Sequence, residues 1–387
     1  MEFQLEHFSV NWIDGMKISK DHFVDSNNHV VDLFRDGLST YVNSYNYGLT
    51  TPDFNAVSSF ELSVDDSSEN TFSVKLNKCK AITSGGFKIN IDQTKHPEES
   101  LSKQIQKKTR SISSNEETSL YEIILIANPY KRKPIGTPSI EESPPRHPYT
   151  EVKYDLQIMP KDEINILHLG PYYFLLGKIK NNNGHISLMN EYIPASICIK
   201  SHKDLILFHE QCVRHIQTIQ DISYKIIQKI HSKNKPSNLA KNFMTLCENT
   251  LTYISSIYFT LVNELPDSAP IKLINCMSTL ANNHSRTYQV LPNEEREELL
   301  KYFFEWTEFT PQKFEQLLTS SSNIKYDHNN IQPALLKITQ YLEITETVWN
   351  KMNSLDFIGQ RKENIVVTKQ TIQPKEEAAK KRWSILD

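Results

Sequence analysis

The apolar residues of this chain follow two different periods, and the change falls near residue 200. Before it, short segments alternate apolar and polar residues, which is the period of a β-strand with one buried face. These segments are 58–64, 72–76, 87–91, 121–127, 154–159, 172–179 and 185–188. We expect them to form an antiparallel sandwich or barrel.

Three stretches of this first half do not alternate. One runs from Ser19 or Lys20 toward Val42 and is predicted to be a helix, although its apolar residues fit one broad face imperfectly. The others, 95–117 and 129–148, are rich in polar residues and in proline, respectively, and are predicted to be long loops.

Beyond residue 200, apolar residues recur three or four positions apart, which is typical of a helix with one apolar stripe. The stripe comprises Leu205, Phe208, Cys212, Ile216, Ile219, Ile222, Ile226 and Ile230. A turn at 234–238 and a second stripe over 239–261 predict an antiparallel helical hairpin. Further helices are predicted at 270–282, 293–306, from Pro311 onward, and at 330–354.

The long stripe has two interpretations, which the spacing does not separate. It is either the core of a single bundle or a seam that also contacts other copies of the chain. The candidate oligomerisation residues are Leu205, Phe208, Cys212, Ile216, Ile219, Ile226 and Ile230.

Together these patterns predict an α+β protein. An N-terminal antiparallel β-sandwich-like domain with one early helix is expected over 1–198, and a long helical hairpin over 199–290. A C-terminal helical region follows at 291–358, and a charged, flexible tail at 359–387. No internal repeat is evident.

Composition narrows the class of protein. The net charge is −3, which gives no overall electrostatic attraction to nucleic acid. The five cysteines are scattered and form no Cys-x-x-Cys pair, as expected in a reducing compartment. No apolar run approaches the roughly 20 residues of a membrane-spanning helix, and the N-terminus lacks the pattern of a secretory signal. We therefore expect a soluble cytoplasmic protein without direct membrane insertion.

Sequence motifs for catalysis are missing. The chain contains 10 glycines and no phosphate-binding Gly-rich loop, no His-Glu-x-x-His pair and no Gly-x-Ser-x-Gly elbow. We therefore predict no catalytic, cofactor or metal site. An enzyme whose site forms only in space remains an alternative, because such clusters are not defined by sequence order.

The last residues combine charge with apolar anchors. Trp383, Ile385 and Leu386 follow a run of mixed Lys and Glu residues that cannot form a core. Such anchors on a terminus often act as a docking peptide. The alternative is a frayed end with incidental apolar residues.

Residues 12–23 read WIDGMKISKDHF. This segment resembles the opening of the TssK family, baseplate proteins of bacterial type VI secretion systems, whose pattern is Trp-x-Glu-Gly-Met/Leu-x-Leu-x-Pro-Gln-His-Phe. Trp12, Gly15, Met16, His22 and Phe23 match this pattern directly. Lys20-Asp21 stands where the family has Pro-Gln, which is a departure from the pattern. The family ends in a further head domain, whereas this chain ends in a predicted helix and a charged tail, so it resembles a divergent, Bacteroidetes-like form.

The resemblance implies a homotrimeric structural adaptor of a contractile injection system. It would link the baseplate wedge proteins TssF and TssG to membrane-complex proteins, at the inner face of the inner membrane. The five matching residues would lie on the baseplate side and the tail anchors on the membrane-complex side. Two alternatives stand beside this. The motif is an internal staple of the β domain, or the chain is a phage-tail-like receptor-binding protein.

Overall fold

Alternating burial along the strands creates the first of two hydrophobic cores. A computed structural model describes residues 5–54, 56–66, 71–93, 101–106, 118–161, 169–182, 184–233, 235–307 and 309–361. Its strands are β1 (Gly48–Leu49), β2 (Phe60–Asp65), β3 (Thr71–Ile82), β4 (Lys88–Asp92), β5 (Leu101–Gln106), β6 (Thr118–Ile135), β7 (Tyr149–Pro160), β8 (Tyr173–Asn182) and β9 (His185–Leu188). Each of the seven segments overlaps one of these strands, so the predicted strands are confirmed.

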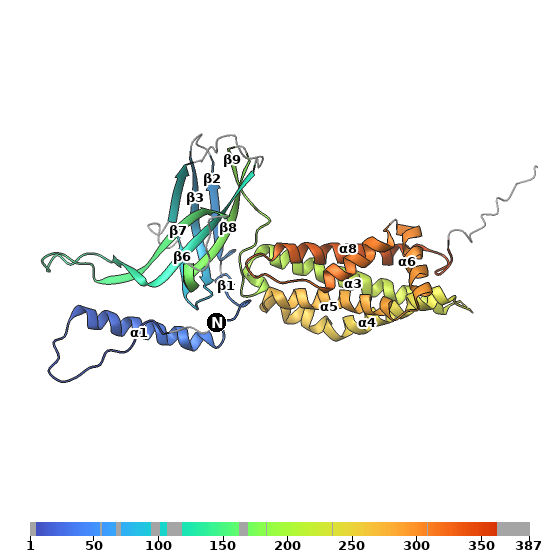
Figure 1. The fold of residues 1–387 in the computed structure, drawn as a ribbon, viewed down its shortest axis with the longest axis horizontal. Helices are drawn as coiled ribbons and strands as arrows, with labels where there is room; N and C mark the ends of the chain where they lie inside the picture. Colours follow the sequence, from blue (N-terminus) through green and yellow to red (C-terminus); the bar gives the residue numbers. More distant parts are fainter. Residues whose placement is uncertain are drawn as a thin grey trace, which may run out of the picture.

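The strands form two antiparallel sheets that pack face to face (Figure 1). In the first, β3 pairs with β1, β2, β4 and β5. The second has the order β7-β6-β8-β9. Val74 and Leu76 of the first sheet share a buried cluster with Ile123, Leu125 and Phe174 of the second. The expected sandwich-like domain is therefore present.

Both predicted loops were wrong in part. Within 95–117, β5 pairs with β3 from Leu76↔Leu101 to Thr71↔Gln106. Within 129–148, β6 continues to Ile135 and pairs with β7 as far as Ile135↔Tyr149. The register shifts between Ala127 and Arg132, and this irregularity accommodates Pro129 where a regular ladder would lose a hydrogen bond. The result is a β-ribbon that projects beyond the sandwich (Figure 1).

The second half is a helical bundle. Its helices are α3 (Lys203–His231), α4 (Asn238–Asn263), α5 (Pro270–Gln289), α6 (Asn293–Thr307), α7 (Pro311–Ser322) and α8 (Gln332–Ser354). The single-turn 3₁₀ helices are η3 (Gly170–Tyr172), η4 (Ile199–Ser201) and η5 (Leu265–Asp267). One hydrophobic cluster runs from Ile193 to Met352, so 199–290 and 291–358 share a core.

Trp349 lies at the centre of this core and is fully buried. Its ring centroid is 5.4 Å from that of Phe243 and 5.4 Å from that of His284, and the His284 ring stacks on it. The Trp349 Nε1–H donates to Ser223 Oγ at 2.9 Å, which satisfies the one polar group of the indole.

The β domain and the bundle are joined by direct contacts around Tyr47. Its carbonyl oxygen lies 2.8 Å from Nε2 of His328, a residue of the loop before α8, and its hydroxyl donates to Asn329 at 3.1 Å. Gly48, with φ +114°, follows directly, and a Cβ there would lie 2.0 Å from the Ala195 carbonyl oxygen. Only glycine permits this approach between β1 and the chain that leads into the bundle.

Helix α1 (Lys20–Ser39) lies apart from both cores (Figure 1). The N-terminal arm, defined here as residues 5–19, runs along α1 to the end that is farthest from the bundle and returns there into the helix (Figure 1). Helix α1 and the bundle helices α3, α4, α5 and α8 run roughly along the longest axis of the molecule (Figure 1).

Candidate partner-binding surface

A buried polar network fastens the arm and α1 to the β domain. Asp32 is 2% exposed and accepts hydrogen bonds from the backbone N–H groups of Glu6 and His7, both at 2.7 Å. Its other oxygen pairs with Arg35 at 3.0 Å and accepts from the Tyr130 hydroxyl. A carboxylate with this many donors holds the arm against the helix.

The charge state of Asp32 follows from these partners. Burial alone would raise its pKa, because a low dielectric disfavours the ionised carboxylate. The hydrogen bonds from Tyr130 and from the backbone of His7 and Glu6 outweigh burial, and the pKa lies below its usual value. Asp32 is therefore ionised in the folded chain at neutral pH.

Arg35 connects the helix to the β domain. Its guanidinium donates to Tyr130 at 2.6 Å and to the Gly85 carbonyl at 3.3 Å, and lies 4.8 Å from the centre of the Tyr172 ring. The Tyr172 hydroxyl donates in turn to Glu6. Tyr130 lies on β6 and Gly85 between β3 and β4, so the anchor reaches both sheets. Burial together with the Glu6 hydrogen bond raises the pKa of Tyr172, which keeps it a donor.

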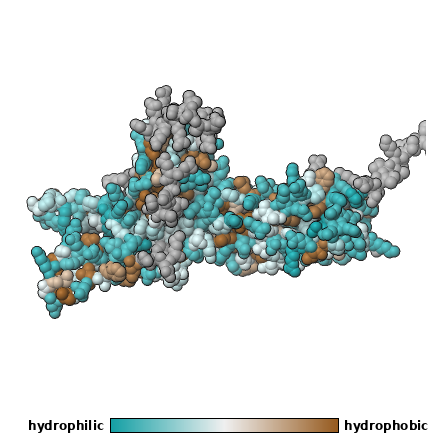
Figure 2. Space-filling view, viewed as in Figure 1, coloured by the Kyte–Doolittle hydropathy of each residue, from teal (hydrophilic) through white to brown (hydrophobic). Residues whose placement is uncertain are grey.

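This anchoring gives α1 the reverse of the usual orientation, with its polar side toward the protein and its apolar side toward solvent. The buried residues of the helix are polar, namely Asn28, Asp32 and Arg35. The exposed large apolar residues are Phe23, Val24, Val30, Leu33, Phe34 and Leu38. An amphipathic helix on a globular protein normally buries its apolar face, so the outward face of α1 has the character of a contact surface. Figure 2 shows apolar residues gathered near the α1 end of the molecule.

The five residues that match the family pattern come together where the arm returns into the helix. Trp12 is 49% exposed and Phe23 is 62% exposed, and their ring centroids lie 6.2 Å apart. Gly15 adopts φ +77° in the turn between Ile13 and Met16, as expected for a glycine there. The Ser19 N–H donates to His22 Nδ1 at 3.1 Å, so His22 takes the place of the Glu or Gln of a capping box.

We call Trp12, Gly15, Met16, His22 and Phe23 the aromatic tip. Met16 and His22 also border an open groove of about 440 Å³ between the arm and α1. None of the five belongs to the buried cluster of the β domain. The interpretation of the motif as an internal staple of that domain is therefore wrong, because the large side chains that would form the staple face outward.

The apolar stripe of α3 is buried, in contrast to the exposed aromatic tip. The seven residues predicted for oligomerisation, Leu205, Phe208, Cys212, Ile216, Ile219, Ile226 and Ile230, are between 0% and 6% exposed in the single chain. They pack within the chain's own bundle core, so the structure supports the first of the two interpretations. A contact between copies would need other side chains.

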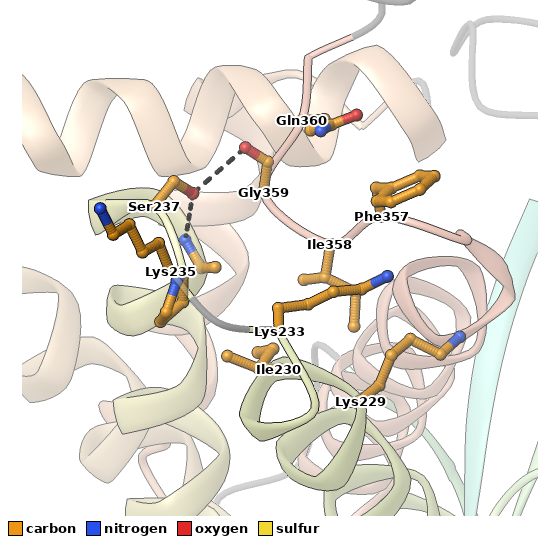
Figure 3. A pocket seen from close by; sticks show the side chains of 11 residues that line it. Lys229, Ile230, Lys233, Lys235, Ser237, Phe357, Ile358, Gly359 and Gln360 are labelled. Carbon is orange, nitrogen blue, oxygen red and sulfur yellow. Dashed lines mark hydrogen bonds between the residues drawn. The ribbon is translucent and has the colours of Figure 1, made fainter.

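The tail anchors Trp383, Ile385 and Leu386 lie outside the described residues. The chain approaches them at the far end of the bundle, where 357–360 and the α3–α4 turn enclose a pocket of about 320 Å³ (Figure 3). Lys233 lies 4.2 Å from the Phe357 ring centre, and Lys229 donates to the carbonyls of Asn353 and Leu355. These contacts hold residues 353–357 against the end of α3.

Spacing along the sequence did not reveal Asp32 and Arg35 as functional residues. The only signal was a pair of opposite charges three residues apart within the predicted helix. Their partners Tyr130 and Tyr172 follow about a hundred residues or more later and carry no motif. Among the residues that the structure describes, no group of three His, Cys, Asp or Glu side chains is arranged to hold a metal. None of the described helices combines the length and apolar content needed to cross a bilayer.

Comparison with known proteins gives matches among solved structures alone. No family model and no curated protein matches the chain. Similar solved structures are those of TssK and of type VI secretion baseplates. A crystal structure of TssK matches 87% of this chain and 69% of its own, with 14% identity and a TM-score of 0.47. A TssK-TssF-TssG baseplate subcomplex matches 87% of this chain and 100% of its own, with 14% identity and a TM-score of 0.46. A chain of the baseplate complex from the type VI secretion system matches 87% of this chain and 99% of its own length, with 14% identity and a TM-score of 0.47.

Proposed function

We propose that this chain is a structural adaptor of a type VI secretion baseplate. It would act as a homotrimer that links the wedge proteins TssF and TssG to proteins of the membrane complex. The observation that carries the proposal is the exposure of Trp12 and Phe23. They are two of the five residues through which the opening segment resembles the TssK family, and an exposed Trp and Phe on a projecting tip are typical of a binding hot spot.

The arrangement of the molecule suits an adaptor. The aromatic tip lies at one end of the longest axis, and the bundle end that leads into the tail lies at the other (Figure 1). The contacts of Tyr47 with His328 and Asn329 join the two domains between these ends. A connection of this kind keeps the two contact surfaces apart, and three copies would add avidity at each surface.

The first test replaces the tip side chains. We expect a Trp12→Ala, Phe23→Ala double variant to weaken co-purification with TssF and TssG by at least about tenfold in apparent Kd, because hot-spot truncations cost more than about 1.4 kcal/mol. Phe259→Ala is the matched control, since Phe259 on α4 is 69% exposed and lies in the other domain. Retained binding by the double variant, with the control also unchanged, would contradict the assignment of the tip to the wedge proteins.

The second test removes residues 375–387, and with them Trp383, Ile385 and Leu386. We expect the truncated chain to keep its oligomeric mass and its unfolding transition but to lose most binding to membrane-complex proteins. The physical reason is that the described core of the bundle extends from Ile193 to Met352, before the removed segment begins. A pull-down in which the truncated and full chains bind the membrane proteins equally would dismiss the docking role of the tail.

A further inference from the structure

The pocket at the far end of the bundle combines three lysines with an apolar lining. Lys229 lies in the last turn of α3, and Lys233 and Lys235 lie in the connection to α4. Ile230 and Ile358 line the same cavity of about 320 Å³ (Figure 3). No Asp or Glu is among the described residues that line it. We call this cavity the basic pocket.

The charge around the basic pocket differs from that of the whole chain. Residues 222–247, which form the end of α3 and most of the start of α4, contain five lysines and no Asp or Glu, whereas the net charge of the chain is −3. Carboxylates of the neighbouring helix α6 have partners of their own. Glu295 accepts a hydrogen bond from Asn242 at 2.7 Å, and Glu305 pairs with Arg361. The surroundings of the pocket therefore favour a negatively charged partner.

The wall formed by the chain after α8 is held in place by contacts within the protein. A Cβ on Gly359 would lie 2.6 Å from Ser237 Oγ, so the backbone there lies directly against the start of α4. The Gly359 N–H donates to the Tyr302 hydroxyl at 2.9 Å. Lys233 Nζ lies 4.2 Å from the centre of the Phe357 ring, which is a favourable cation–π distance. A pocket with fixed walls loses little conformational entropy when a ligand binds.

The lining of the basic pocket indicates the chemistry of its ligand. Lys229 already donates to two backbone carbonyls, but Lys233 and Lys235 are exposed, so their ammonium groups remain accessible. The volume lies at the small end of ligand pockets, roughly 300–1,000 Å³, and suits a single large side chain. An inorganic anion would use the lysines and leave the apolar lining without a contact. A peptide in which carboxylates flank one apolar side chain uses both.

We infer that the basic pocket binds an acidic segment of another protein. One apolar side chain of the segment packs against Ile230 and Ile358, and its carboxylates pair with Lys233 and Lys235. This contact lies at the end of the molecule opposite the aromatic tip (Figure 1). The inference goes beyond the proposed function, because it assigns a binding site to described residues of the bundle and does not depend on the tail anchors.

The test measures how labelled peptides bind the full-length chain, by fluorescence anisotropy. We expect Glu-Asp-Leu-Asp-Glu to bind saturably and at least tenfold more tightly than Glu-Asp-Gly-Asp-Glu, which lacks the apolar side chain. The Lys233→Glu, Lys235→Glu double variant should bind the leucine peptide at least tenfold more weakly than the wild type.

The matched control is the Lys313→Glu, Lys325→Glu double variant, which reverses two exposed lysines of the same domain outside the pocket. It should change the Kd of the leucine peptide less than threefold. Unfolding curves establish that both double variants are folded. A wild-type chain that does not bind the leucine peptide, or equal losses of binding in the two double variants, would overturn the inference.

Two other occupants of the pocket would give different results. Peptide binding that appears only after residues 362–387 are removed would show that the chain's own tail fills the pocket, and would overturn the inference. So would pocket-dependent sedimentation with vesicles of phosphatidylserine and phosphatidylcholine that the leucine peptide does not inhibit, because the lysines would then bind a membrane surface. Peptide binding by a chain without affinity for TssF and TssG would uphold the inference and contradict the proposed function.

Discussion

Replacing Asp32 with alanine is expected to detach the arm and α1 from the β domain. The variant loses the acceptor of the Glu6 and His7 amides and leaves the buried Arg35 without its closest carboxylate. Removing one partner of a buried ion pair costs roughly 3–5 kcal/mol. Exchange of the Glu6 and His7 amides with solvent deuterium should therefore speed up by about a hundredfold or more.

Two further variants sharpen this test. Asp36→Ala removes an exposed carboxylate from the same helix and should leave exchange at these amides unchanged. Asp32→Asn keeps the size and an acceptor oxygen but not the charge, so its effect should lie between those of Asp32→Ala and the wild type. If the Glu6 and His7 amides of Asp32→Ala stay as protected as in the wild type, the network does not hold the arm.

Lowering the pH is expected to destabilise the bundle through His284. This side chain is buried between Thr250 Oγ1, 2.9 Å from Nε2, and the Tyr341 hydroxyl, 2.8 Å from Nδ1. Burial lowers the pKa of His284 to about 3, against 6.5 for the ordinary value. Between these two pH values the unfolded chain binds a proton that the folded chain does not. The stabilisation is complete above pH 6.5 and falls by about 1.4 kcal/mol per pH unit below it.

The contribution of His284 is isolated by comparing pH profiles. Between pH 6.5 and 4.5, the wild type should lose roughly 2 kcal/mol of unfolding free energy more than His284→Gln does, because glutamine does not titrate. Urea unfolding of both proteins at several pH values measures this difference. His231→Gln, at an exposed site at the end of α3, is the control and should follow the wild type. Parallel profiles for wild type and His284→Gln would contradict the prediction.

The bundle and most of the sheet could be predicted from the sequence because their signals are local. The α3 stripe repeats over many turns, and Pro311 marks the start of α7 where the ring is tolerated. The strand β5 was missed because Leu101 and Ile105 are its only large apolar residues, in a segment that is otherwise polar. Its pairing partner β3 lies some thirty residues earlier, and pairing at that distance leaves no trace in the periodicity.

The candidate surface was predicted only in part, because some of its signals are local and others depend on residues far away in the sequence. The aromatic tip carries a motif, so its residues could be named from the sequence. The sequence did not predict which side of α1 faces the protein, because the apolar residues of a helix normally face inward. The orientation of α1 is set by Tyr130, whose hydroxyl donates to Asp32 and accepts from Arg35. Tyr130 lies 98 and 95 residues away from these two along the chain.

That separation also affects how the protein is made. Helix α1 is among the first segments to leave the ribosome, but Tyr130 and Tyr172 are added much later. At roughly 5–20 residues per second, on the order of ten seconds pass before both are available. During that interval the nascent chain exposes the apolar residues of α1 before the tyrosines that anchor the helix have been synthesised. Synthesis of neighbouring copies on one messenger RNA therefore brings such helices close together before any of them has found its final position.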